Sequence, residues 1–311
     1  MPDLLTTDEA AAYLRLSERK LYELVANGAV PCSKATGRWL FPKSALDQWV
    51  MAGLRAETAA VAPPIVGGSH DPLLEWALRE SGSGLASLPE GSESGLLRLS
   101  RGEVIAAAIH LHRHEGMKGG RAPSSGEPPD VASLRDDETA NTDAVAHAPG
   151  LHSAVVITFA RREQGLLIVA GNPLGLSDIA SVGRTRARLA VRPAGAGAQL
   201  LLLTLLAGAD MTLADLQLCR PPCPTGPDIA QAIRAGRADC GIATRAVAQT
   251  AGLGFLPLAW EHFDLALRQR DYFLPGPQAL FAFMRGRAFA ERAAELGGYD
   301  VAASGAVRHV N

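Results

Sequence analysis

The sequence predicts an α/β protein, with mixed or parallel sheets covered by helices, behind a small helical module at the N-terminus. Beyond about residue 65, short apolar runs such as 154–159 and 240–243 alternate with helical stretches such as 229–235. This alternation is typical of sheets that are covered by helices. The 311 residues are 47% hydrophobic and 20% charged, which is enough apolar material for a substantial core.

The first fifty residues carry start and stop signals for two short helices. Thr6–Glu9 has the S/T-x-x-E pattern of a capping box and predicts a first helix that ends near Arg15. Ser17 is placed to cap a second helix over Glu18–Asn27, and Gly28 suits the position after its end. Two short helices joined by a tight turn form a helix-turn-helix, in which the second helix enters the major groove of DNA.

A basic hairpin follows these two helices. Lys34–Phe41 reads as a wing in which Gly37 turns the chain and Arg38 presents a charge to phosphate. Ser44–Asp47 then begins a third helix, and the module is complete by about Ala52. The net charge of −2 means that any contact with DNA is local. The residues expected to contact DNA are Ser17, Arg19, Lys20, Tyr22, Lys34 and Arg38.

The module resembles the winged helix-turn-helix domain of the excisionase/MerR type, which implies that it binds a double-stranded DNA operator. The alternative is a helical hairpin that serves only for protein contact. The basic wing favours the DNA-binding reading. The resemblance rests on Thr6, Glu9, Ala10, Ala11, Leu14, Ser17, Leu21, Tyr22, Gly28 and Pro31.

The sequence also indicates in which cellular compartment the protein is expected. The N-terminus lacks a secretory signal pattern, and the longest apolar run, 200–209, is too short to span a membrane. The four cysteines have no C-x-x-C spacing, so we expect reduced thiols. A cytoplasmic protein without a membrane partner is the expectation.

The domain boundaries follow from composition. We predict the DNA-binding domain over residues 1–53, a linker over 54–64 and a sensor domain over 65–311. Within the sensor, residues 119–150 are rich in Pro, Gly, Ser, Asp and Glu and predict a flexible insertion.

Three glycine-containing loops precede predicted helices in the sensor, at 67–72, 91–95 and 193–199. Helix N-termini present unpaired N–H groups and the positive end of the helix dipole, so they favour anions. Each loop alone is more often an ordinary turn, but three together predict a site for a small anion.

Six motifs of the predicted sensor lie at 67–71, 92–103, 108–111, 162–173, 235–241 and 296–300. Together they resemble the periplasmic-binding-protein-like domain, a relative of type II solute-binding proteins that is associated with molybdopterin biosynthesis. The resemblance implies two α/β lobes that close on a small ligand, with molybdate or tungstate favoured.

One loop departs from that family. Relatives commonly carry R-x-x-G-S-G-T-R where this chain has Arg192-Pro-Ala-Gly-Ala-Gly-Ala-Gln199, so two hydroxyls and the second arginine are absent. This loop offers backbone donors and Arg192. The residues expected to contact the ligand are Ser69, His70, Asp71, Ser92, Ser94, His110, Arg192, Gly195, Gly197 and Asp239.

His110, His112 and His114 also allow a metal site, because alternate residues of a strand share one face. The competing interpretation keeps His110 in the pocket and leaves the other two exposed. We assign no metal ligand and no cofactor. No nucleophile with its base, P-loop or metalloprotease helix occurs, so we expect no enzyme activity.

Together these features predict a ligand-responsive transcription regulator. Because one recognition helix reads a single half-site, we expect a homodimer formed largely through the sensor. The rival hypotheses are a binding protein or enzyme of molybdenum-cofactor biosynthesis and a metal sensor.

Overall fold

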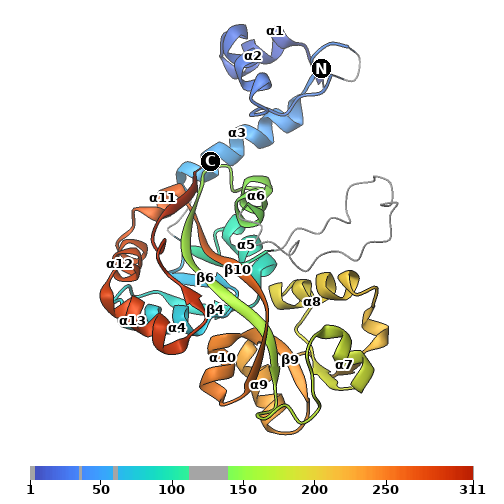
Figure 1. The fold of residues 1–311 in the computed structure, drawn as a ribbon. Helices are drawn as coiled ribbons and strands as arrows, with labels where there is room; N and C mark the ends of the chain where they lie inside the picture. The colour runs from blue at the N-terminus through green and yellow to red at the C-terminus, as the bar shows by residue number, and fades with distance from the viewer. Residues whose placement is uncertain (1–3, 35–36, 59–61, 112–138, 311) are drawn as a thin grey trace. The chain divides into compact units, whose positions relative to one another are not determined.

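The computed structural model describes residues 4–34, 37–58, 62–111 and 139–310, and the chain divides into two compact units, Met1–Val61 and Ala62–Asn311 (Figure 1). The division falls inside the predicted linker. Among the described residues, no helix is both long enough and apolar enough to cross a membrane.

The first unit contains the predicted helix-turn-helix. Thr6 forms the capping box with Glu9, and the Ser17 side chain accepts a hydrogen bond from the backbone N–H of Lys20. Gly28 has a φ of +63°, as its place after the second helix requires. The elements are β1 (Leu4–Leu5), α1 (Thr7–Leu14), α2 (Glu18–Ala26), β2 (Phe41–Pro42) and α3 (Lys43–Thr58).

The wing and the third helix complete this unit. Ser33 and Leu40 bridge across the hairpin, and Gly37 turns the chain with a φ of +82°. Helix α3 is longer than predicted, since it continues to Thr58 through the first half of the predicted linker. Residues 51–57 are mostly strong helix formers, and no proline follows the start of α3 until Pro63, so the helix can continue.

The second unit is built on one ten-stranded mixed sheet with the order β4-β3-β5-β10-β6-β9-β7-β8, and β11 and β12 pair with β6. The strands are β3 (Ile65–Gly68), β4 (Ala86–Pro89), β5 (Ala106–Ile109), β6 (Ala154–Ile168), β7 (Arg188–Ala190), β8 (Gln217–Cys219), β9 (Cys240–Thr244), β10 (Gly254–Arg268), β11 (Tyr299–Asp300) and β12 (Val307–Val310).

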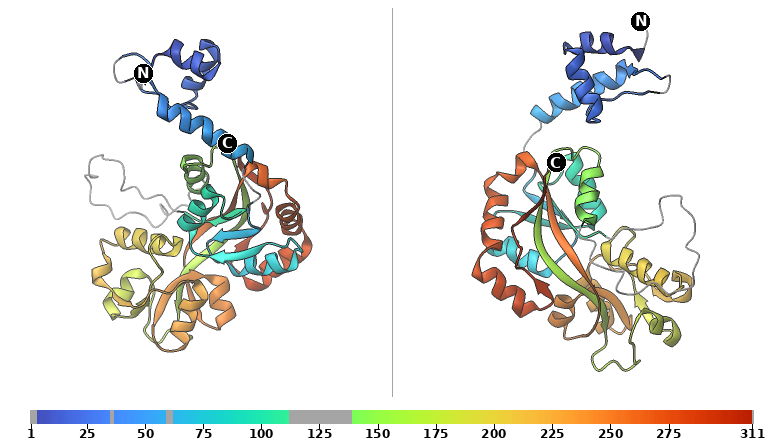
Figure 2. Two further views of the ribbon diagram at one scale, coloured as in Figure 1. Left: turned by 180° about the vertical axis from the view of Figure 1, so that it is seen from behind. Right: turned by 45° about the horizontal axis from the view of Figure 1, so that its top comes forward.

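Helices cover this sheet in two lobes, which Figures 1 and 2 show on either side of the crossing strands. The first lobe holds β3, β4 and β5 with α4 (Pro72–Glu80), α5 (Ser92–Arg101), α6 (Ala140–His147), α11 (Gln269–Tyr272), α12 (Pro275–Met284) and α13 (Arg287–Leu296). The second lobe holds β7, β8 and β9 with α7 (Ile179–Thr185), α8 (Gly197–Gly208), a short 3₁₀ helix (Leu213–Asp215), α9 (Gly226–Arg234) and α10 (Arg245–Ala251).

Two long antiparallel strands, β6 and β10, connect the lobes. They pair along almost their whole length, from Ala154 against Arg268 to Ile168 against Gly254. Ile157 of β6 belongs to the core of the first lobe, whereas Leu166 belongs to the leucine-rich core of the second. The apolar run that the sequence shows at 154–159 covers only the first part of β6, which continues through a polar middle to Ile168.

The predicted insertion at 119–150 contains a helix in its last part. Helix α6 buries Val145 fully, and the side chain of Asn141 donates to Asp264 and accepts from the backbone N–H of Leu111. These contacts tie α6 to the first lobe. Residues 112–138 lie outside the described part of the chain.

The packing of α5 on β3 depends on Gly95, and the packing of β3 beside β5 depends on Gly68. A Cβ on Gly95 would lie 2.5 Å from Cα of Gly68, and a Cβ on Gly68 would lie 2.3 Å from the carbonyl oxygen of Ala108. Backbone atoms cannot move aside as a flexible side chain can. The close approach brings the start of α5 against the loop that follows β3.

We predict that Gly95→Ala lowers the free energy of unfolding by about 1–3 kcal/mol, because α5 must move away from β3. Denaturant unfolding followed by circular dichroism measures this effect. Ser94→Ala, at an exposed position of the same helix, should change stability by less than about 0.5 kcal/mol. Equal stability of both variants would show that α5 is not held by this contact.

Candidate functional site

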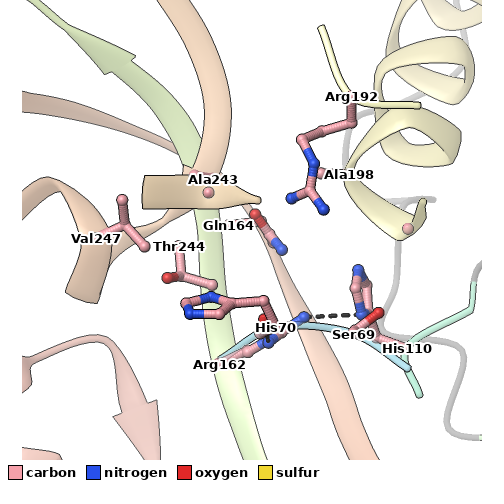
Figure 3. A pocket seen from close by; sticks show the side chains of 12 residues that line it. Ser69, His70, His110, Arg162, Gln164, Arg192, Ala198, Ala243, Thr244 and Val247 are labelled. Atoms are coloured by element: carbon pink, nitrogen blue, oxygen red, sulfur yellow. Dashed lines mark hydrogen bonds between the residues drawn. The ribbon is translucent and has the colours of Figure 1, made fainter. Parts of the chain in front are cut away.

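A pocket of about 360 Å³ lies where the two lobes meet (Figure 3). Part of this volume is open to solvent, so the enclosed part suits a ligand of few atoms. Both lobes and β6 contribute to its walls. The lining residues are Ser69, His70, His110, Arg162, Gln164, Arg192, Gly197, Ala198, Gly226, Ala243, Thr244 and Val247.

The starts of two helices of the second lobe line this pocket. Gly197 is the first residue of α8 and Gly226 is the first residue of α9. A Cβ on Gly197 would lie 1.9 Å from Nε2 of His110, so only glycine allows α8 to begin this close to the first lobe. The N–H groups at the start of α8 favour an anion, as the sequence predicts for the loop at 193–199. The start of α9 adds the N–H of Gly226, because Pro227 has no N–H and the N–H of Asp228 donates to the Thr225 hydroxyl.

Arg162 holds the floor of the pocket and is itself fully buried. Its Nη1 donates to Oδ2 of Asp71 at 2.9 Å, its Nε donates to Oε1 of Glu261 at 2.7 Å, and its Nη2 donates to Nδ1 of His110 at 2.8 Å. Burial alone would lower the pKa of Arg162, but Glu261 and Asp71 raise it above the usual value. The guanidinium therefore stays charged and fixes three side chains at once.

The contact with Arg162 determines the tautomer of His110. An arginine can only donate, so Nδ1 of His110 is the acceptor and the ring hydrogen sits on Nε2. The backbone of His110 is held by the Ser92 hydroxyl, which accepts from its N–H at 3.1 Å. Ser92 in turn lies 2.9 Å from the Ser69 hydroxyl. This series of hydrogen bonds orders the pocket wall that the first lobe forms.

Arg192 enters the pocket from the second lobe, opposite Arg162. Its Nη2 donates to the carbonyl oxygen of Pro224 at 2.6 Å, whereas its buried Nε has no hydrogen-bond partner among the described residues. Burial, and then the nearby charge of Arg162, lower the pKa of Arg192 from 12.5 to about 10. A bound anion would offset both effects, because it would pair with this charge.

His70 lies beside these arginines. Burial lowers the pKa of its imidazole, so the neutral ring prevails at neutral pH. Its carbonyl oxygen accepts a hydrogen bond from Nη1 of Arg162 at 3.3 Å. His70 thus contributes a polar, uncharged ring to the site.

Five residues of the predicted ligand set line the pocket: Ser69, His70, His110, Arg192 and Gly197. Two others do not line the pocket but form hydrogen bonds with residues that do. Ser92 holds His110, and Asp71 caps α4 through Oδ1 while its Oδ2 accepts from Arg162 and from the Tyr299 hydroxyl.

The remaining three predicted residues do not line the pocket. Asp239 precedes β9 at the end opposite Thr244, and it binds the guanidinium of Arg188 at 2.6 Å. Ser94 is exposed on α5. A Cβ on Gly195 would lie 2.5 Å from Oε2 of Glu93, which places Gly195 at a contact between the lobes.

Sequence reasoning missed several lining residues, above all Arg162, Gln164 and Thr244. Arg162 and Gln164 belonged to a motif that was noted only for its resemblance to the family. Thr244 ends β9 directly before α10, so the rule that ligands gather where strands end and helices begin would have found it.

The metal hypothesis receives no support from the described residues, which contain no group of three or more His, Cys, Asp or Glu side chains that could hold an ion. His112 and His114 lie outside the described part of the chain.

The predicted DNA-binding residues lie on the first unit. Arg19 and Arg38 are exposed, and the side chain of Tyr22 is 48% exposed on α2. Lys20 pairs with Glu23 of the same helix at 2.9 Å, and Lys34 lies over the ring of Trp39. The positive charges of α2 and of the wing are therefore accessible to phosphate.

Two family models match the chain. A model described as a helix-turn-helix domain matches residues 4–53, and a model described as a PBP superfamily domain matches residues 75–285. No curated protein matches the sequence.

Similar solved structures include a putative phosphate ABC transporter substrate-binding protein with bound phosphate from Clostridium perfringens. The identity is 9%, the TM-score is 0.51, and the match covers 75% of this chain and 96% of that one. The tungstate ABC transporter structure from Geobacter sulfurreducens has 13% identity, a TM-score of 0.48 and coverage of 75% and 99%. A hydrogen-peroxide-bound mutant of OxyR from Corynebacterium glutamicum has 13% identity, a TM-score of 0.48 and coverage of 94% and 89%.

We predict that Arg162→Met lowers the free energy of unfolding by about 3–5 kcal/mol, because it leaves Asp71 and Glu261 buried without their shared cation. Tyr299→Phe, which removes one hydrogen bond to Asp71, should cost about 1 kcal/mol. Denaturant unfolding of both variants measures the difference. Similar small losses in both would mean that Arg162 does not hold the floor of the pocket.

Proposed function

This chain belongs to the PBP superfamily, and we propose that it is a DNA-binding transcription regulator that responds to a small oxyanion. The N-terminal helix-turn-helix domain would read an operator, and the two-lobed domain would bind the effector. The pocket between the lobes carries the proposal. It combines the N-termini of α8 and α9 with Arg192, a half-buried arginine whose buried Nε has no partner within the described part of the chain.

Charge in the pocket suits a small oxyanion. Arg162 is already paired with Asp71 and Glu261, whereas Arg192 has no carboxylate partner among its described contacts. A ligand that carries negative charge would be attracted to Arg192 and to the helix N-termini together. A ligand without charge would leave the half-buried guanidinium of Arg192 beside the charge of Arg162, which the nearby carboxylate of Asp228 offsets only in part.

Molybdate and tungstate, which the sequence resemblance favours, are first members of this class to test. The loop at 192–199, which departs from the family pattern, affects which oxyanion the pocket can select. Ala198 lines the pocket where relatives have a hydroxyl, and Gln199 accepts a hydrogen bond from the backbone N–H of Arg192. Selectivity therefore depends on side chains outside this loop.

Binding would act on DNA through the arrangement of the lobes. The pocket takes residues from both lobes and from β6, so a ligand stabilises the lobe arrangement in which these groups converge. In a homodimer, which we also propose, this change would alter the spacing of two recognition helices. A ligand changes DNA affinity only by its differential affinity for the two arrangements.

The test uses the full chain with a DNA duplex selected from a random library. We expect molybdate, tungstate, phosphate or sulfate to change the DNA affinity, measured by fluorescence anisotropy, by about 5- to 150-fold. Arg192→Met should abolish the response and keep the ligand-free affinity, since it removes the positive charge that faces the ligand. Arg234→Met, at an exposed position of α9, is the matched control and should respond like the wild type.

Absence of any response in the wild type to all four oxyanions would contradict the proposal. A response that persists in Arg192→Met would move the effector to another site.

A second prediction concerns the two arginines that are expected to contact DNA, Arg19 and Arg38. Arg38→Ala should weaken binding to every duplex and reduce the salt dependence, because a wing arginine contacts phosphate. Arg19→Ala should in addition relax sequence preference, because α2 as the recognition helix would lie against base edges. Titrations of selected and scrambled duplexes at several salt concentrations separate the two effects. Uniform weakening in both variants would remove Arg19 from base recognition.

A further inference from the structure

Three buried polar atoms of the pocket have no hydrogen-bond partner among the residues that the structure describes: Nε of Arg192, Oγ1 of Thr244 and Oε1 of Gln164. Their side chains come from three different elements and line the same pocket (Figure 3). Gln164 is only 3% exposed and Thr244 only 6%, so water outside the pocket cannot satisfy them. A buried polar atom without a partner is costly, and a ligand is the natural source of that partner.

The orientation of the Gln164 amide is fixed by its neighbour. Its Nε2 donates to Oε1 of Glu261 at 3.0 Å, and that same carboxylate oxygen accepts from Nε of Arg162 at 2.7 Å. A reversed amide would place its oxygen against a carboxylate oxygen. The amide oxygen of Gln164 is therefore the group left to pair with a ligand, and an amide oxygen can only accept.

Several other groups around the pocket offer hydrogens. Arg192 can only donate, the ring hydrogen of His110 sits on Nε2, and the helix starts at Gly197 and Gly226 present N–H groups. The hydroxyls of Ser69 and Thr244 and the neutral ring of His70 can each accept as well as donate. Gln164 differs from them because its amide oxygen can only accept and has no partner among the described residues.

An oxyanion without hydrogens cannot satisfy such a group. Sulfate, molybdate and tungstate carry no proton at neutral pH, so each would place an oxygen acceptor opposite the acceptor of Gln164. Phosphate keeps at least one proton at neutral pH and has a similar tetrahedral shape. Its P–O–H group can donate to Gln164 while its other oxygens accept from the donors.

We propose that Gln164 selects an oxyanion that carries its own hydrogen donor, of which hydrogenphosphate is the simplest. This inference rests on the proposed function, because it assigns the effector of the same pocket. It also reverses the order of candidates that the sequence resemblance implied, since molybdate and tungstate lack the donor.

The experiment measures the affinity of the full chain for inorganic phosphate, sulfate and tungstate by calorimetry in a phosphate-free buffer at neutral pH. We expect phosphate to bind about 10- to 100-fold more tightly than sulfate or tungstate, because the latter leave a buried acceptor unpaired. The ratio of the two dissociation constants is compared within each variant, so a general weakening of the pocket cancels.

Gln164→Met keeps the length of the side chain and removes the amide oxygen. We expect its phosphate-to-sulfate preference to fall to within about threefold of unity, while both anions still bind through Arg192. Thr244→Val is the matched control, since it removes a hydroxyl of the same pocket, and its preference should stay within about threefold of the wild type. Thermal unfolding shows whether each variant is folded, and the wild-type preference does not depend on either variant.

Each other outcome overturns the inference in its own way. Equal or tighter binding of sulfate or tungstate by the wild type would refute the role of Gln164 and leave an oxyanion regulator standing. Loss of the preference in Thr244→Val with no loss in Gln164→Met would assign the acceptor to the hydroxyl. No binding of any oxyanion would overturn the proposed function together with the inference.

Discussion

The buried guanidinium of Arg162 is the interaction on which the sensor depends. It lies in the middle of β6, which pairs with β10 and runs through both lobes. From there it binds Asp71, which caps α4, and Glu261, which lies on β10. It also fixes the tautomer of His110, which follows the last residue of β5. A single cation thus joins the first lobe to the crossing strands, and the same network provides the wall against which a ligand would lie.

Much of this architecture could be predicted because local rules govern it. The capping box at Thr6 and the glycine after α2 are sequence-local signals, and both occur as expected. The polar middle of β6 could not be predicted from pattern, because Arg162, Glu163 and Gln164 interrupt an apolar run and suggest a loop. They remain in the strand because each is paired within the fold, which only distant partners such as Glu261 and Arg245 make possible.

The predicted ligand residues show the same difference between local signals and contacts made by the fold. Ser69, His70 and Arg192 follow strands in the sequence, so the rule that ligands gather at strand ends identified them. Asp239 failed because it lies before β9 rather than after it, where its carboxylate binds Arg188. Thr244, at the other end of the same strand, occupies the pocket instead. The direction of a strand therefore decides which of its flanking polar residues can reach a ligand.

The loss of two hydroxyls from the loop before α8 changes where recognition takes place. With Ala198 in place of a hydroxyl residue, this loop offers backbone groups and Arg192, whereas Gln164 and Arg162 line the pocket from β6. A ligand held by β6 contacts the strand that connects the lobes, not only a loop at the surface of one lobe. Binding energy would then act directly on the element whose geometry sets the lobe arrangement, which is the condition for coupling the pocket to DNA.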